Sequence, residues 1–140
     1  IMTRTQTRQL AFELLYSLEI QKVTKEEQEE QINLFLEEQE ENKEKVREYI
    51  LDIVKGITNN AEEIQNLISK NLKEKWELSR ISKINLTILK LAIYEMVYNK
   101  LPYKIVVNEA VELAKKYGED TSPAFVNGIL ANIIKQSGLV

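Results

Sequence analysis

Apolar residues recur along most of this chain at the three- and four-residue spacing of a buried helical face, and no segment of any length alternates as a strand does. Only four Gly and two Pro interrupt the pattern. The chain therefore predicts helices throughout. The first helix is expected over residues 4–20, with these residues facing inward: Leu10, Leu14, Leu15 and Leu18.

Three further helices are expected before residue 73. Thr24 and Glu27 have the T-x-x-E spacing of a capping box, which starts the second helix. The pattern then fades near Glu41 and Asn42, and Gly56 lies inside or at the end of the third helix. The apolar residues expected to face the core are Ile32, Leu34, Phe35 and Leu36; Val46, Ile50, Ile53, Val54 and Ile57; and Ile64, Leu67, Ile68 and Leu72.

The segment 85–98 is apolar on almost every side, which is typical of a helix that is buried all round. A turn or short helix over 76–81 is expected to lead into it. We place segment 85–98 at the centre of a C-terminal subdomain, where the two helices of segment 101–130 cover it.

A short polar loop joins those two covering helices. Pro102 opens the first, and Gly118 is expected to end it in the left-handed conformation that glycine tolerates. Ser122 is expected to cap the second, with Pro123 at its first position, where a missing amide hydrogen costs little. The buried face of the first is expected to contain Val106, Val107, Ala110, Val111, Ala114 and Tyr117.

Together these elements predict an all-α fold of about seven helices, in a single domain with two subdomains at about 4–58 and about 59–136. The chain has 140 residues and 44% of them are apolar, enough to fill a core of its own. No run of about 18 apolar residues occurs and the start of the chain is polar, so a cytoplasmic protein without a membrane segment is expected.

Charge is distributed unevenly along the chain. The net charge is −3, but residues 1–25 carry +2, residues 26–69 carry −9 and residues 70–140 carry +4. The two basic regions could form one positive face for a nucleic acid. The acidic runs are more simply explained as solvated helix faces.

The composition argues against an enzyme. The chain has no His and no Cys, and it lacks a glycine-rich phosphate loop, so no catalytic residue and no cofactor is expected. Carboxylates at i,i+4 spacing, Glu26 with Glu30 or Glu37 with Glu41, are the obvious candidates for a metal site. Because such pairs are common on exposed helices, no metal is expected.

One candidate RNA-binding surface lies on the first helix. Arg4, Arg8, Phe12 and Tyr16 follow one another at i,i+4 spacing on one side of it. Arginines bind phosphates, and aromatic rings stack on unpaired bases. The alternative is that the rings are core residues and the arginines are only solvated, and the pattern alone favours this alternative.

A second candidate surface lies at the start of the last helix, residues 121–128. Backbone amides at a helix start bind anions, and Phe125 could stack on a base there. Phe125 could equally continue a buried stripe with Ile129 and Ile133. Gly128 would fit a close approach between helices, and Asn127 could bond to a neighbouring backbone.

Three segments of the chain resemble the NusB family of bacterial transcription antitermination factors. The most recognisable is PYKIVVNEAVELAKKYG, followed after a short gap by FVNG at 125–128. Segment 76–95, WELSRISKINLTILKLAIYE, is also similar to the family pattern. The third similarity, near the start, is in Arg8, Ala11, Leu15, Tyr16 and Glu19.

The resemblance implies an all-helical protein that binds single-stranded boxA RNA together with NusE, a small-subunit ribosomal protein. Such a complex joins the RNA polymerase elongation complex, notably on ribosomal RNA operons. The residues that the resemblance assigns to RNA are Arg4, Arg8, Tyr16 and Phe125, with Thr121 where the family often has an acid. Asn85 would lie near the interface with the protein or the RNA.

Two other functions are compatible with the sequence. Similar helical domains precede ribosomal RNA cytosine methyltransferases, although this chain carries no catalytic half. The chain could also be a purely structural interaction module, as a monomer or a homodimer, whose basic face serves a protein. The sequence departs from the family pattern in its thin N-terminal arginine motif and in Asn85 and Leu86, which replace the usual acid–base pair. These departures leave the expected fold unchanged and favour a lower intrinsic affinity for RNA.

Overall fold

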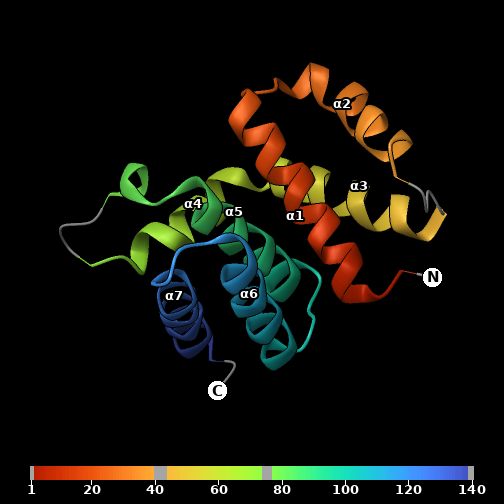
Figure 1. The fold of residues 1–140 in the computed structure, drawn as a ribbon. Helices are drawn as coiled ribbons and strands as arrows, with labels where there is room; N and C mark the ends of the chain where they lie inside the picture. The colour runs from red at the N-terminus through yellow and green to blue at the C-terminus, as the bar shows by residue number, and fades with distance from the viewer. Residues whose placement is uncertain (1, 40–43, 74–76, 139–140) are drawn as a thin grey trace. The chain divides into compact units, whose positions relative to one another are not determined.

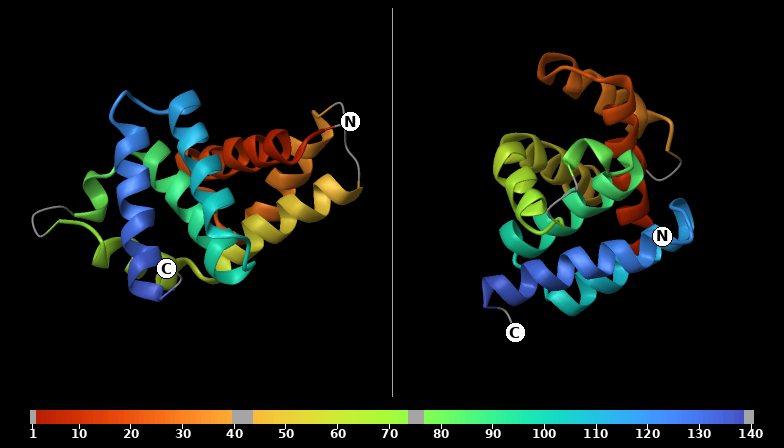
Figure 2. Two further views of the ribbon diagram at one scale, coloured as in Figure 1. Left: turned by 90° about the horizontal axis from the view of Figure 1, so that it is seen from below. Right: turned by 90° about the vertical axis from the view of Figure 1, so that its left-hand side faces the viewer.

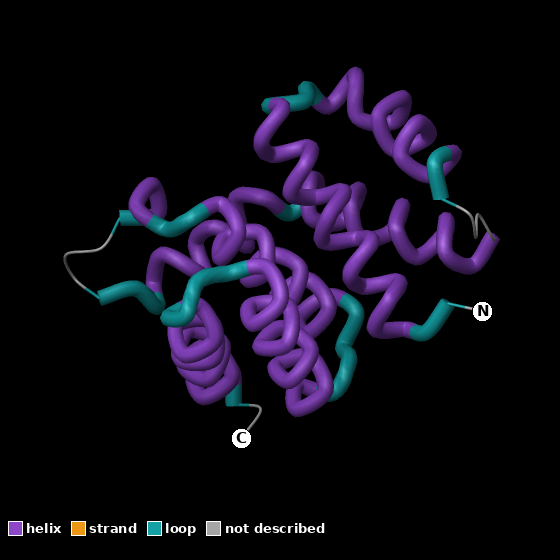
Figure 3. Tube along the Cα trace, in the orientation of Figure 1, coloured by secondary structure: helices purple, strands orange, loops and turns teal. Residues whose placement is uncertain are grey.

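The computed structural model describes residues 2–39, 44–73 and 77–138, and these residues form seven α-helices and no strand (Figures 1 and 3). The prediction of an all-α fold with about seven helices is confirmed. The expected fading of a helix near Glu41 and Asn42, and the start of a turn at Trp76, lie outside the described residues. The chain folds as two units, Ile1–Asn59 and Asn60–Val140.

The first unit contains three helices that contact one another pairwise: α1 (Arg4–Gln21), α2 (Lys25–Glu37) and α3 (Glu44–Asn59). Its buried apolar residues are Ala11, Phe12, Leu14, Ile32, Leu36, Ile50, Ile53, Val54 and Ile57. On α1 the buried side differs from the predicted one, because Thr7 and Arg8 join it. Three predicted core residues of α1 are only half-buried: Leu10, Leu15 and Leu18.

Helix α2 is also less buried than its pattern predicts. Ile32 and Leu36 are fully buried, whereas Leu34 is 49% exposed and Phe35 is half-buried. A run of adjacent apolar residues cannot all face one side of a helix. The prediction of four core residues here was therefore wrong for Leu34.

The reciprocal capping box occurs at α1 and not at the predicted place. Thr3 accepts a hydrogen bond from the Gln6 amide (3.1 Å), and the Gln6 side chain accepts one from the Thr3 amide (2.8 Å). Thr24 does cap α2 by accepting from the Glu27 amide (3.3 Å). The Glu27 carboxylate, however, accepts from the Thr24 hydroxyl (2.8 Å), so only half of the predicted box is present.

The second unit is built around one buried helix, α5 (Lys83–Ile93). It contacts α4 (Ala61–Lys70), α6 (Tyr103–Tyr117) and α7 (Ser122–Ser137). Figures 1 and 2 show α6 and α7 side by side. The residues of α5 that are buried are Thr87, Ile88, Leu89, Leu91, Ala92 and Ile93. The predicted central position of this segment is confirmed, and the expected short helix before it is a single 3-10 turn, η1 (Leu78–Arg80).

Helix α5 continues into a wider π-helical turn, η2 (Tyr94–Tyr98). The Asn99 amide donates to the Tyr94 carbonyl (3.1 Å), and the Leu101 amide donates to the Glu95 carbonyl (3.0 Å). These two bonds end the helix, and Lys100 then takes a left-handed conformation with φ of 57°. The chain turns there toward α6.

The loop between α6 and α7 differs from its prediction at both ends. Gly118 is extended, with φ of −93° and ψ of −169°, and so is not in the left-handed conformation. Ser122 is the first residue of α7 and not its cap. Its hydroxyl accepts a hydrogen bond from the Glu119 amide (3.0 Å), which stabilises the loop.

Close packing, not conformation, explains glycine at position 118. A Cβ atom there would lie 2.5 Å from the buried hydroxyl of Ser122 and 2.8 Å from the carbonyl oxygen of Ala114. Gly128 is the opposite case, since a Cβ atom there would have no neighbour within 4 Å. The expectation that Gly128 allows two helices of this chain to approach closely was wrong.

We therefore predict opposite effects for two Gly→Ala substitutions. Gly118→Ala should lower the free energy of unfolding by about 1–3 kcal/mol, because Ser122 must move and lose its bond. Gly128→Ala should raise it by about 0.5–1 kcal/mol, because alanine is the better residue inside a helix. Urea unfolding of the two variants measures both changes, and a stable Gly118→Ala variant would contradict the packing explanation.

The second unit should also lose stability at alkaline pH through Tyr98. Burial of its hydroxyl, with the Glu63 carboxylate beside it, raises the pKa of Tyr98 to about 12. The folded state thus favours neutral Tyr98, so its contribution is complete below pH ~10 and is lost as the pH rises toward ~12. Between pH ~9 and ~11 the unfolding free energy of the wild type should fall by about 1 kcal/mol relative to Tyr98→Phe. A difference that stays constant with pH in urea titrations would rule this out.

Candidate nucleic-acid interface

Arg4 stands at the start of α1, exposed to solvent. Its guanidinium carbon lies 4.9 Å from the centre of the Tyr49 ring on α3, in cation–π geometry. The stacking holds the guanidinium in place while its edge, which carries the donors, stays available. A pre-positioned guanidinium of this kind is suited to a phosphate.

Arg8, one turn further, is placed differently from the expectation for a phosphate ligand. Only 3% of it is exposed. A guanidinium buried to this extent cannot reach a phosphate without a rearrangement. The predicted pair of RNA-binding arginines is therefore reduced to one accessible arginine, and Arg8 has the burial of a structural residue.

The two aromatic residues of α1 form a stacked pair. The rings of Phe12 and Tyr16 are 6.1 Å apart between centroids and inclined by 15°. Phe12 is 2% exposed and belongs to the core, as the alternative reading expected, whereas Tyr16 is half-buried. Phe12 thus supports one side of Tyr16, and the exposed part of Tyr16 is available to a ligand.

Thr121 and Phe125 lie one turn apart at the start of α7. The Phe125 amide donates to the Thr121 carbonyl (3.1 Å), and Thr121 is exposed while Phe125 is half-buried. Phe125 is less buried than Ile129 and Ile133, which continue the same line along the helix. Its ring therefore closes the core only in part.

This helix start is poorly suited to bind an anion by its backbone. The amides of Ser122 and Phe125 donate within the chain, to the carbonyls of Glu119 and Thr121. Pro123 has no amide hydrogen. Side chains are therefore the main candidates for an RNA contact at this end, and Phe125 is the largest of them.

Asn85 lies in the first turn of α5. Its amide donates to the hydroxyl of Ser82, the cap of this helix (3.1 Å), and the residue is half-buried. Its side-chain oxygen is buried and accepts no hydrogen bond from the part of the chain that the structure describes. The residue is thus positioned by its backbone, while the side-chain amide is not committed.

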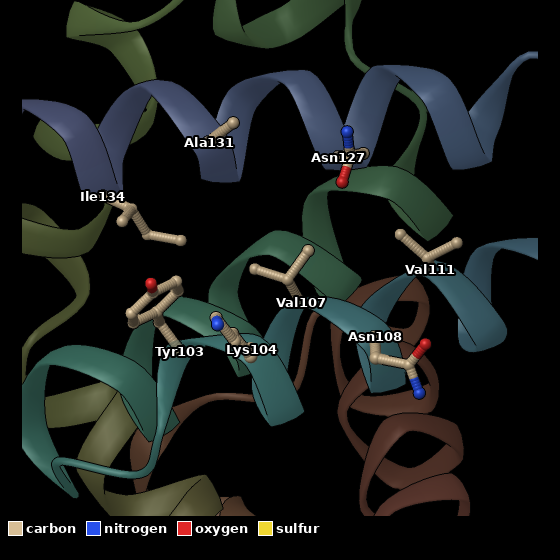
Figure 4. Close-up of a pocket in the computed structure, with 8 residues that line it drawn as sticks. All are labelled: Tyr103, Lys104, Val107, Asn108, Val111, Asn127, Ala131 and Ile134. Atoms are coloured by element: carbon tan, nitrogen blue, oxygen red, sulfur yellow. The ribbon is translucent and has the colours of Figure 1, made fainter. Parts of the chain in front are cut away.

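Two features of the surface were not predicted from the sequence. Tyr49 supports Arg4, and no spacing along the chain could reveal this because the residues come from different helices. The other is a groove of about 470 Å³ between α6 and α7 (Figure 4). Val107 and Val111, which belong to the apolar face predicted for α6, line this groove and so face open space.

Neither a metal site nor a membrane span is found in residues 2–39, 44–73 and 77–138. No group of three or more Asp, Glu, His or Cys side chains there could hold a metal ion. Glu26 and Glu30 belong to no such group, and Glu41 lies outside these ranges. No helix within them is both long and apolar enough to cross a membrane.

Comparison with known proteins places the chain in a family. The model of the NusB family matches residues 5–135. The transcription antitermination protein NusB of Acetivibrio thermocellus is 51% identical over 135 residues, covering 96% of this chain and 90% of that protein.

Solved structures agree with this assignment. T. maritima NusB superposes with a TM-score of 0.84 at 34% identity, covering 96% of this chain and 92% of that one. A structure of the antitermination factors NusB and NusE in complex with dsRNA gives a TM-score of 0.82 at 27% identity, with coverage of 96% and 99%. That complex contains both a protein partner and RNA.

The burial of Arg8 generates a prediction about stability. Arg8→Ala should lower the free energy of unfolding by about 1–3 kcal/mol, because it removes a long buried side chain and its hydrogen-bonding groups. Arg4→Ala, at the exposed end of the same helix, should change it by less than about 1 kcal/mol. Thermal and urea unfolding compare the two. Equal effects would show that Arg8 is not structural.

Proposed function

Because the chain belongs to the NusB family of transcription antitermination proteins, we propose that it binds single-stranded boxA-type RNA together with NusE. In this proposal the complex joins elongating RNA polymerase in the cytoplasm and promotes processive transcription of ribosomal RNA operons. The chain is an antitermination factor and not an enzyme.

One observation carries the proposal of the two partners. The chain has the fold of the NusB in the complex with NusE and RNA over 96% of its length. The RNA of that structure is described as double-stranded. We assign a single-stranded ligand here because two partly exposed rings, Tyr16 and Phe125, are available to stack on unpaired bases.

Each unit carries proposed RNA contacts of its own. On the first, Arg4 binds a phosphate from its stacked position on Tyr49, and Tyr16 stacks on a base. On the second, Phe125 stacks on a base and the exposed hydroxyl of Thr121 bonds to the backbone. Arg8 contributes indirectly, by stabilising the packing of α1. This role differs from the direct phosphate contact that the sequence predicted.

The proposed contact with NusE includes Asn85. Asn85 lies in the first turn of α5, where its backbone amide donates to the hydroxyl of the Ser82 cap. Because the side-chain oxygen of Asn85 is buried, we expect an acceptor of NusE to bond to the side-chain NH₂ group. A homodimer formed through the same surfaces would compete with RNA and NusE for them. Light scattering should therefore show one copy of this chain in the complex.

Other functions are less well supported. A methyltransferase-targeting domain would be expected to match only part of its relatives, yet the chain covers 90% of the length of the relative described above. A purely structural module predicts no affinity for RNA. That second alternative is separated from the proposal by the following experiment.

Fluorescence anisotropy with labelled boxA RNA, with and without NusE, measures the proposed binding. Phe125→Ala should weaken it by about 5- to 100-fold, the cost of one lost stacking contact. Arg4→Ala should weaken it less and should reduce the slope of log K against log salt by about 1, the loss of one phosphate contact. Wild-type affinity should fall steeply between low and moderate salt.

The matched control is Asn132→Ala, an exposed position on α7 outside the proposed contact. It should leave affinity within about twofold of the wild type. Absence of RNA binding with and without NusE would exclude the proposal. Binding that Phe125→Ala does not change would remove Phe125 from the site.

A further inference from the structure

The groove between α6 and α7 is separate from the residues proposed for RNA. Tyr103, Val107 and Val111 line it from α6, and Ala131 and Ile134 line it from α7 (Figure 4). Its volume is about 470 Å³. All of these residues belong to the second unit. The walls of the groove are thus mainly apolar and come from two adjacent helices.

The α6 wall is apolar beyond what the fold needs. Val106, Ala110 and Ala114 already bury the side of α6 that faces the core. Val107 and Val111 lie beside them, at helical spacing, and remain half-buried. Apolar side chains that are left facing solvent in a groove are typical of a surface that another molecule covers.

The α7 wall is low at Ala131, which lies between the larger side chains of Asn127 and Ile134. Ala131 is exposed on the groove. Gly128, one turn before it, has no atom within 4 Å of where its Cβ would lie. Small residues at these positions allow the backbone of a partner to come close to α7.

The charges around the groove are basic. Of the eight lining residues Lys104 alone is charged, beside the amides of Asn108 and Asn127. Lys135 follows Ile134 on α7. Helix α7 contains no acidic residue.

The two acidic residues of α6, Glu109 and Glu112, do not line the groove. Glu112 is paired with Lys115 at 3.3 Å. Lys104 has no ion pair within the part of the chain that the structure describes, and its positive charge lies beside an apolar floor. The complement of this groove is an apolar surface flanked by carboxylates.

We propose that this groove binds a short amphipathic helix of a partner protein, whose apolar side chains fill it and whose Asp or Glu meets Lys104. The lining residues of α6 from Tyr103 to Val111 span about 12 Å at 1.5 Å per residue, or roughly two helical turns. A helix of that length presents apolar residues at i, i+4 and i+7. An RNA strand fits less well, because only one cation lines the groove and the floor offers no aromatic face beyond Tyr103.

The proposal is tested by selecting phage-displayed random peptides of about 16 residues on the full chain, a length that allows a helix of this kind. The expected result is enrichment of peptides with apolar residues at i, i+4 and i+7 and with Asp or Glu beside them. Synthetic copies should bind in fluorescence anisotropy and become helical on binding. A failure to enrich any peptide, or enrichment of basic ones, would overturn the proposal.

Two matched variants locate the site. Ala131→Glu places bulk and a repelling charge in the groove and should weaken peptide binding at least about tenfold. Asn132→Glu adds the same charge to the same helix at an exposed position that does not line the groove, and should change binding less than about twofold. Equal effects of the two variants would place the peptide elsewhere and refute the proposal.

Lys104→Glu tests the charge. This variant should bind the acidic peptide more weakly than the wild type does. It should bind a version with Lys in place of Asp and Glu more tightly. Because Lys104 is exposed, the fold should tolerate the change, and circular dichroism checks this. A preference that does not reverse would refute the contact with Lys104.

Other occupants give different results with the same variants. If RNA fills the groove, Ala131→Glu weakens RNA binding more than Asn132→Glu does and leaves peptide binding unchanged. If a second copy fills it, the wild type self-associates in sedimentation and Ala131→Glu abolishes this. Either result overturns the proposal. Neither of these results depends on Phe125. The proposal of boxA binding is therefore tested separately, by the Phe125→Ala variant.

Discussion

The burial of α5 is the constraint on which the second unit depends. A helix that is apolar on nearly every side has to be covered on every side, and α4, α6 and α7 do this. Burying each of its larger side chains, such as Leu89, contributes on the order of 1.5–3 kcal/mol. Because α6 and α7 must both lie against α5, the loop between them has to be tight. That loop is where Gly118 and Ser122 pack and where Phe125 begins α7.

Hydrophobic spacing was sufficient to predict this arrangement. The seven helices of the described residues and the buried position of α5 follow from the sequence, because both depend on a period that is visible along the chain. What the spacing could not predict depends on contacts between distant residues. Arg8 looks like a surface residue in the sequence and is buried in the structure. Gly118 looks like a left-handed cap, but a neighbour four residues away requires the glycine.

The candidate RNA site was predictable to a smaller extent for the same reason. Regular spacing placed Arg4, Arg8, Phe12 and Tyr16 on one side of α1, and this is correct as geometry. Exposure divides them, since Phe12 and Arg8 are buried while Arg4 and part of Tyr16 remain accessible. The partner that positions Arg4, the ring of Tyr49, comes from another helix. The proposal that the ligand is RNA comes from the resemblance to the family, because spacing alone could not identify a ligand.

The groove is lined by the part of α6 that is not needed to cover α5. The sequence pattern assigns Val106, Val107, Ala110 and Val111 to one apolar face, and such a face is wider than one neighbouring helix can bury. The half with Val106 and Ala110 is buried, and the other half, with Val107 and Val111, lines open space beside Ala131. If packing within the chain were the only demand on α6, polar residues at those two positions would serve as well. Their apolar character therefore points to a demand from outside the chain.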